Sequence, residues 1–296
     1  MTAKRFIRKI LQFAIAGTFL ISVLSVVQAQ DNPVKIRLNS AGIVQNSAYR
    51  VEKSTGFGFS GQFNRRLTKN FDITFRVGYN THYLTQDSVL DEWNWDYWDQ
   101  RYVDFLDNVG SFTKSNGKLH YTKNDTTFLA DFDPRQTLGE TMLSLGLEYH
   151  KDLMKNVRFF ADCNFGVNVY RRNIKMLEDW TKTFHWDTTS AAMKTNLELL
   201  REVFGLDSNT VEYDYEYQIQ ITHFAPPKKG KLFFVTPTVG MRFYLSPSMD
   251  LDIAYQFTYY MDGGKLGDLF DFPKDSYRWY PLKSTSQLTF GLTFKY

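Results

Sequence analysis

The last eight residues of the chain, from Thr289 to Tyr296, alternate between apolar side chains and residues that are polar or glycine. An extended strand over this stretch directs the apolar side chains to one face and the others to the opposite face. The apolar set is Phe290, Leu292, Phe294 and Tyr296. Because chain termini are usually polar and frayed, this ending is unusual for a soluble domain and predicts a strand with one apolar face.

Seven further segments carry the same alternation, so the sequence predicts eight strands. The predicted strands span residues 34–44, 55–65, 71–83, 138–149, 157–170, 231–244, 250–261 and 284–296. Each is about ten to fourteen residues long, which is the length that a tilted strand needs to cross a bilayer. The pattern of the first segment fades after Asn39, but a strand is needed there for turns and loops to fall on opposite ends of a barrel.

The connections between these segments alternate in length. The short ones cover residues 66–70, 150–156 and 245–248, and the long ones cover residues 84–137, 171–230 and 262–283. Transmembrane barrels place short turns in the periplasm and long loops outside. We therefore expect large extracellular loops with local folding of their own, and we expect His150 at a periplasmic turn.

The C-terminal stretch also resembles the insertion signal of Gram-negative outer-membrane β-barrels, in which a polar residue, a glycine, an aromatic residue and a terminal aromatic hold fixed places. Together with the strand rhythm, it makes the chain similar to the eight-stranded barrels of the OmpA-domain, OmpX and OmpW type. The resemblance implies an all-β fold, an eight-stranded antiparallel transmembrane β-barrel whose long extracellular loops contain short helices. It is architectural, since no residue-level functional motif is shared.

The N-terminus predicts export. Four basic residues within the first nine positions precede a largely apolar stretch, and a small-residue cleavage motif ends at Ala29. We expect residues 1–29 to be a cleaved signal peptide and residues 30–296 to form a barrel in the cell outer membrane, surrounded by its lipid. Without residues 1–29 the net charge changes from +3 to −1, with 31 basic against 32 acidic residues. This balance leaves no basic surface for nucleic acid.

The polar face of the predicted strands lines a lumen that, with eight strands, is only wide enough to be filled by side chains. The expected inward charges are of both signs: Arg37, Arg76, Arg158, Arg242, Glu140, Glu148, Asp162 and Asp252. Charges inside a membrane protein persist when they pair in its interior, so we expect a salt-bridged lumen. Cys163 falls on the lipid-facing side and is expected to be structural.

The first long loop contains the main candidate site. Residues 88–108 are rich in aromatic and acidic side chains, and their apolar residues recur at roughly helical spacing. The candidate binding residues are Trp93, Trp95, Asp96, Tyr97, Trp98 and Asp99. Indoles beside carboxylates could stack on a sugar ring or anchor an envelope protein. Alternatively, the aromatic stripe packs on the barrel mouth or on its own loop. A second helix is expected over residues 191–206.

Neither a metal nor a cofactor is expected, because the acidic residues of the first loop lack the spacing of a calcium site. A lipid-modifying enzyme would need a serine beside a histidine near one membrane face. The histidines, including His82, do not neighbour a serine on a predicted strand in that way. Pro237 removes one hydrogen bond from a predicted strand, either at a bulge near the outer rim or at a sideways opening.

These features predict a non-enzymatic outer-membrane barrel that binds at the cell surface or serves as a subunit or scaffold of an envelope complex. Two alternatives stay open. One is an OmpW-like conduit that passes small apolar molecules sideways through the wall, and the other is a barrel enzyme that remodels lipids.

Overall fold

A computed structural model describes residues 34–49, 51–86, 89–100, 112–115, 118–123, 126–185, 214–261 and 277–295. The expected signal peptide, the expected helix at residues 191–206 and most of the third long connector lie outside these residues. Within the described ranges, no helix has both the length and the apolar character needed to cross a membrane.

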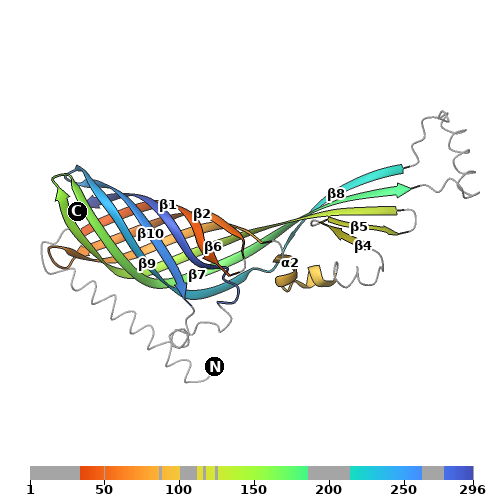
Figure 1. The fold of residues 1–296 in the computed structure, drawn as a ribbon, viewed down its shortest axis with the longest axis horizontal. Coiled ribbons are helices and arrows are strands. Elements are labelled where there is room, and N and C mark those ends of the chain that lie inside the picture. Colours follow the sequence, from red (N-terminus) through yellow and green to blue (C-terminus); the bar gives the residue numbers. More distant parts are fainter. Residues whose placement is uncertain are drawn as a thin grey trace, which may run out of the picture. The chain divides into compact units, whose positions relative to one another are not determined.

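Eight strands form a closed ring (Figure 1). They are β1 (Val34–Ala48), β2 (Lys53–Arg66), β3 (Phe71–Thr85), β6 (Thr126–Met154), β7 (Val157–His185), β9 (Lys228–Ser246), β10 (Met249–Met261) and β11 (Leu282–Lys295). Their order is β6-β3-β2-β1-β11-β10-β9-β7, and pairing of β6 with β7 closes the ring. The predicted eight-stranded antiparallel barrel is confirmed, including its first strand, which pairs with both β2 and β11.

The two faces of the ring differ as the alternation predicts. On β11, Phe290 and Leu292 are exposed whereas Thr293 is fully buried. On β3, large apolar side chains are exposed at alternate positions: Phe71, Ile73, Phe75, Val77, Tyr79 and Tyr83. Cys163 is exposed on the same outer side, as expected. An apolar exterior around a polar interior is the arrangement that a bilayer requires of a barrel.

The structure confirms the three short connections, but the predicted position of His150 in one of them is wrong. Turns occupy residues 67–70, 155–156 and 247–248. β6 continues to Met154, so His150 lies in this strand and not at a turn. Its side chain is 2% exposed, and its Nε2 lies 3.1 Å from the carbonyl oxygen of Lys69. The strand continues because this hydrogen bond and the burial of the imidazole favour an inward position at residue 150.

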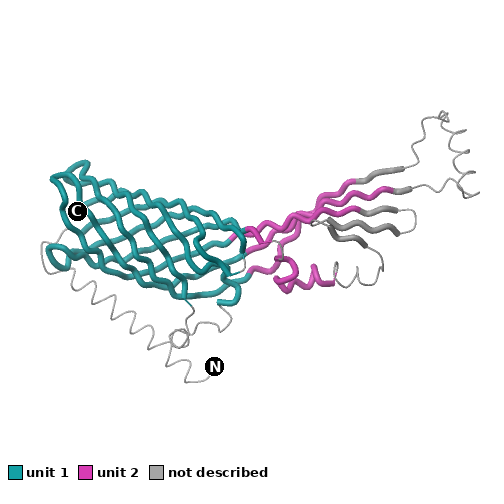
Figure 2. Tube along the Cα trace, viewed as in Figure 1, with its two compact units in different colours: residues 1–84, 138–172, 228–296 teal, residues 85–137, 173–227 magenta. Residues whose placement is uncertain are grey.

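The long connections contain much more strand than expected. The chain divides into two compact units: unit 1 comprises residues 1–84, 138–172 and 228–296, and unit 2 comprises residues 85–137 and 173–227 (Figure 2). β6 and β7 have 29 residues each and run from one unit into the other. In unit 2 three further strands extend the sheet: β4 (Phe112–Ser115), β5 (Lys118–Lys123) and β8 (Asp214–Phe224). β5 pairs with β6, β4 pairs with β5, and β8 pairs with β7.

Within residues 89–100, the described part of the segment expected to be helical, the structure has two short helices, α2 (Val89–Glu92) and α3 (Asp96–Trp98), in place of one continuous helix. Between them Asn94 has a positive φ of 59°, a left-handed conformation that asparagine tolerates better than most residues. A left-handed residue cannot continue a right-handed helix, so the periodic stripe is divided at this point.

Pro237 is accommodated without the expected bulge. Its pairing with Cys163 belongs to a regular ladder between β9 and β7, with no register shift. On the other side, β9 and β10 keep the same register before and after Pro237, but the ladder skips the positions between Thr238 and Val235. Because proline lacks an N–H, the ladder loses contacts there. The hydroxyl oxygens of Thr236 and Thr258 lie 3.1 Å apart across this gap.

Glycine at position 166 is required by the close approach of β6. A Cβ atom added there would lie 2.1 Å from the carbonyl oxygen of Leu143, whereas one added to Gly42 would meet nothing within 4 Å. We expect Gly166→Ala to lower the free energy of unfolding by about 1–3 kcal/mol, as overpacked positions do. Gly42→Ala should change it by less than about 1 kcal/mol. Urea titration in detergent micelles measures both, and equal effects would contradict the prediction.

Candidate functional site

Ion pairs fill the part of the lumen nearer the short turns. We call this group the ionic network; it comprises Arg37, Arg76, Arg242, Glu148, Asp162 and Asp252, each at most 8% exposed. The guanidinium of Arg37 lies 2.5 Å from Glu148, 2.6 Å from Asp252 and 3.8 Å from Asp162. One arginine on β1 therefore joins carboxylates from β6, β7 and β10.

The other two arginines of the ionic network complete its charge balance. Arg242 contacts both carboxylate oxygens of Asp252, at 2.8 and 3.1 Å, and lies 3.3 Å from Glu148. Arg76 lies 3.1 Å from Asp162 and donates to side-chain oxygens of neighbouring glutamines. Three cations thus face three carboxylates, and the expected salt-bridged lumen is confirmed. Of the expected inward charges, Arg158 is outside this network because it is the second residue of β7 and pairs with Asp152.

A second polar group, the Glu140 cluster, lies farther from the short turns. Glu140 is fully buried, and His82 Nε2 lies 3.0 Å from its carboxylate. The side chains of Asn80, Asn168, Tyr260 and Tyr280 also donate hydrogen bonds to it. Tyr280 precedes β11, and its ring contacts those of Tyr170 and Tyr260. The carboxylate is thereby satisfied by donors from several strands and from this preceding segment.

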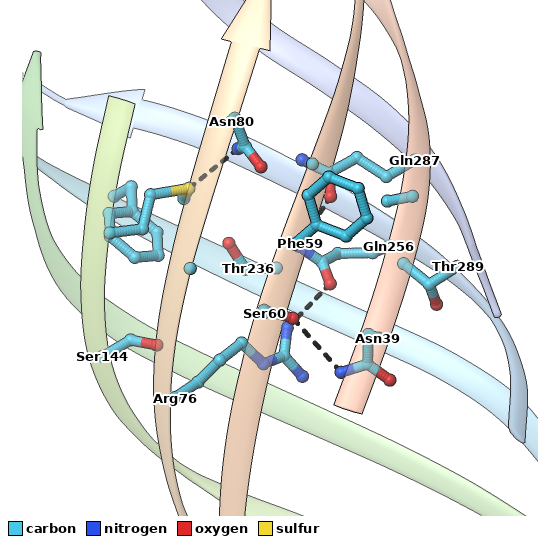
Figure 3. A pocket seen from close by; sticks show the side chains of 15 residues that line it. Asn39, Phe59, Ser60, Arg76, Asn80, Ser144, Thr236, Gln256, Gln287 and Thr289 are labelled. Carbon is cyan, nitrogen blue, oxygen red and sulfur yellow. Dashed lines mark hydrogen bonds between the residues drawn. The ribbon is translucent and has the colours of Figure 1, made fainter. Parts of the chain in front are cut away.

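A cavity of about 20 Å³ separates the two polar groups. Arg76 and Gln256 line it together with Asn80 of the Glu140 cluster (Figure 3). This volume suits about one water molecule, and the lining offers the polar partners that a buried water needs. The lumen described here is therefore packed with side chains, as the narrow barrel predicts.

Three potential metal ligands converge near the ionic network: Asp72, Glu148 and His150 have ligand atoms within 4.8 Å of one another. The same carboxylates already bind cations of the protein. Lys35 Nζ lies 2.7 Å from Asp72, and Arg37 lies 2.5 Å from Glu148. A divalent ion placed there would be repelled by these ammonium and guanidinium groups, so the residues do not fit a metal.

The structure also brings together a serine, a histidine and a carboxylate that sequence reasoning did not connect. Ser54 Oγ lies 3.4 Å from His82 Nδ1, and His82 in turn contacts Glu140. The three come from β2, β3 and β6, so no local sequence signal joins them. All three are at most 1% exposed, which leaves the serine inaccessible to a substrate. The arrangement acts here as part of the hydrogen bonding around Glu140.

In unit 2, the predicted binding residues divide into a buried and an exposed set. Trp93, Trp95 and Trp98 are 1%, 6% and 5% exposed and pack in one hydrophobic cluster. The other members of this cluster are Val89, Leu90, Ala130, Ile174, Met176 and Ala225. Asp96 is exposed, and Asp99 and Tyr97 are partly buried. The indoles thus build the core of unit 2, and the acidic side chains face solvent.

Tyr97 belongs to a polar group that links α3 to the sheet of unit 2. Its hydroxyl donates to Glu178 at 3.1 Å and lies 2.8 Å from His223 Nε2. The carboxylate of Glu178 also accepts a hydrogen bond from Trp180 at 3.0 Å. Residues on β7 and β8 therefore fix the tyrosine, although they lie far from it in sequence.

The closed ring with its apolar outer face and packed polar lumen decides the fold class. The fold is that of an eight-stranded outer-membrane β-barrel. Ail, the attachment invasion locus protein of Yersinia pestis, is similar over 90% of this chain and 100% of its own, at 7% identity and a TM-score of 0.37. OprG from Pseudomonas aeruginosa is similar over 90% of this chain and 96% of its own, at 10% identity and a TM-score of 0.36.

Neisserial surface protein A is similar over 89% of this chain and 97% of its own, at 9% identity and a TM-score of 0.37. At these identities the likeness concerns the fold alone. No protein-family model matches the sequence, and no curated protein matches it.

Proposed function

We propose that this protein is a non-enzymatic barrel of the cell outer membrane that binds a protein partner at the cell surface, as a subunit or scaffold of an envelope complex. Unit 2 supplies the contact surface. The observation that carries the proposal is the exposed acidic set Asp91, Glu92 and Asp96, which lies on a segment whose indoles are buried beneath it. We call this set the acidic surface.

Contacts within unit 2 order this surface before any partner arrives. Trp98 Nε1 donates to Asp91 at 3.1 Å, and Gln86 donates to Glu92 at 3.0 Å. Ordered side chains lose less conformational freedom on binding, which favours affinity. A partner that presents lysine or arginine side chains would complement the acidic surface.

The burial of the indoles favours a protein over a glycan as the partner. A sugar ring needs an exposed aromatic face on which to stack, and Trp93, Trp95 and Trp98 offer almost none. One structure of Ail contains the heparin analogue sucrose octasulfate. A polyanion of this kind would be repelled by the acidic surface, so this mode of binding does not suit the present chain.

A non-enzymatic function agrees with the position of the one serine–histidine contact described above. Ser54 is 1% exposed and His82 is fully buried. Nucleophilic catalysis requires the serine to reach a substrate carbonyl, which these side chains cannot do from inside the packed lumen.

Charge reversal on the acidic surface tests the proposal. We expect Asp96→Lys to weaken capture of a cross-linked partner from outer membranes by about tenfold or more, because it sets like charges against each other. Asp179→Lys is the matched control, since Asp179 is an exposed acid on β7 in the same unit. Capture is quantified by mass spectrometry, with heat-dependent gel mobility as the check on folding. The proposal would be contradicted if the native protein and both variants captured the partner equally. It would also be contradicted if both variants lost capture to the same extent.

A further inference from the structure

The end of unit 1 that carries the short turns contains an open pocket of about 600 Å³. Its lining includes five cationic side chains and no acidic one: Lys35, Arg66, Lys155, Arg158 and Lys295. The rest of the lining is Asn156 and residues 244–247. This volume lies within the range of small-molecule sites, about 300–1,000 Å³. We call it the basic pocket.

Carboxylates that do not line the pocket pair with three of the five cations. Lys35 lies 2.7 Å from Asp72, Arg158 lies 2.6 Å from Asp152, and Lys295 lies 2.7 Å from Asp250. Five cations against these three carboxylates leave a net charge of +2.

The other two cations have weaker partners or none. Arg66 lies 3.9 Å from Asp72, at the far limit of an ion pair, and its side chain is 31% exposed. Lys155 is exposed and forms no ion pair within 4 Å in the part of the chain that the structure describes. These two side chains are therefore available to an anion.

The sequence around the short turns strengthens the positive potential. The basic residues at this end of unit 1 are Lys35, Arg65, Arg66, Lys69, Lys151, Lys155, Arg158 and Lys295. The acidic residues of the same segments are Asp72, Asp152 and Asp250. Eight against three gives a net charge of +5, on a mature chain whose total is near neutral. A concave surface of one sign concentrates counter-ions.

Tyr244 orders one wall of the basic pocket. Its ring lies 5.4 Å from the guanidinium of Arg158 and 4.5 Å from Nζ of Lys295, and its hydroxyl donates to Asp152 at 2.9 Å. Leu245 beside it is 55% exposed. The pocket therefore combines fixed cations with an apolar side chain at its edge.

We propose that the basic pocket binds the phosphate group of an anionic phospholipid of the periplasmic leaflet. Short turns of such barrels face the periplasm, so the pocket opens where phospholipid headgroups lie. Guanidinium and ammonium groups are the usual partners of phosphate oxygens, and basic pockets at a membrane boundary select anionic headgroups. Leu245 provides a contact for the start of an acyl chain. Free phosphate shares the chemistry of the headgroup but lacks this chain.

The test uses the full-length mature protein in detergent micelles and native mass spectrometry. The probes are dihexanoyl phosphatidylglycerol, dihexanoyl phosphatidylcholine and inorganic phosphate. The double variant Arg66→Gln/Lys155→Gln removes the two available cations. The matched control Lys69→Gln/Lys151→Gln removes two exposed lysines from the same two hairpins, β2–β3 and β6–β7, and neither lysine lines the pocket.

We expect phosphatidylglycerol to bind the native protein more tightly than the other two probes do. The double variant should bind it about tenfold or more weakly, and the control variant should stay within about twofold of the native protein. Heat-dependent gel mobility confirms that both variants are folded. An equal loss in the control would overturn the proposal in favour of diffuse attraction. Equal binding of the two lipids, or binding of inorganic phosphate without the lipid, would overturn it as well.

Discussion

Replacing Arg37 by methionine is expected to lower the free energy of unfolding of the barrel by about 3–5 kcal/mol, the cost of removing one partner from a buried ion pair. Arg37 is 2% exposed and is the shared counter-ion of Glu148, Asp162 and Asp252. Methionine fills a similar length without charge, so the three carboxylates would remain buried with too few cations.

Urea titration in micelles, followed by tryptophan fluorescence and gel mobility, measures this loss. The matched control is Arg135→Met, which breaks the ion pair between Arg135 and Asp133. The side chain of Arg135 is 63% exposed and that of Asp133 is 56% exposed. That change should cost less than about 1 kcal/mol, because exposed ion pairs contribute little. Arg37→Lys should be intermediate, since a lysine lacks the planar fork that reaches several carboxylates. If Arg37→Met cost no more than the control, the ionic network would not stabilise the barrel.

Replacing Trp93 by alanine is expected to destabilise unit 2 by about 3–5 kcal/mol, as truncation of a large buried aromatic residue does. Trp93 is the bulkiest of the fully buried side chains among the described residues, and its indole N–H donates to the carbonyl oxygen of Pro226 at 3.1 Å. Alanine would leave a cavity in the hydrophobic cluster and an unpaired carbonyl. The barrel of unit 1 has a hydrophobic cluster of its own, so its folding should be retained.

Limited proteolysis distinguishes the two units in this experiment. Faster cleavage within unit 2, with unchanged heat-dependent gel mobility of the barrel, is the expected result. Phe224→Ala is the control, because Phe224 is in the same unit but 72% exposed, and it should leave the proteolysis rate nearly unchanged. A Trp93→Ala protein with native protease resistance would show that the indole is not needed for packing.

The sequence proposes the candidate binding residues, but it does not predict which of them are buried and which are exposed. Trp93 and Asp96 belong to one aromatic and acidic stretch, and the sequence admitted stacking on a ligand or packing within the loop. Burial of the indole depends on Ile174 and Ala225, which come from the second long connector. No pattern within residues 88–108 shows that these residues lie nearby.

The strand extensions in unit 2 were missed for a similar reason. In the membrane the outward positions of a strand must be apolar, which makes the alternation visible. Along the part of β7 in unit 2, the exposed positions include Lys175 and Asp179, while Ile174 and Met176 are buried. Where water surrounds a strand, its outer face can carry charged side chains. The alternation of apolar and polar residues, from which the end of the strand was predicted, is then no longer visible in the sequence.

The sequence by itself determined the eight strands, their inward and outward faces and the charges within the lumen, because a bilayer imposes a local period of two that each strand must carry. Only the tertiary structure decided which charges meet. Arg37 joins residues up to 215 positions away, and closure of the ring brings Ser54, His82 and Glu140 together. It also gathered the cations of the basic pocket from separate turns and strand ends. Such contacts depend on which strands pair across the closed ring, and the alternation within a single strand does not specify its partner.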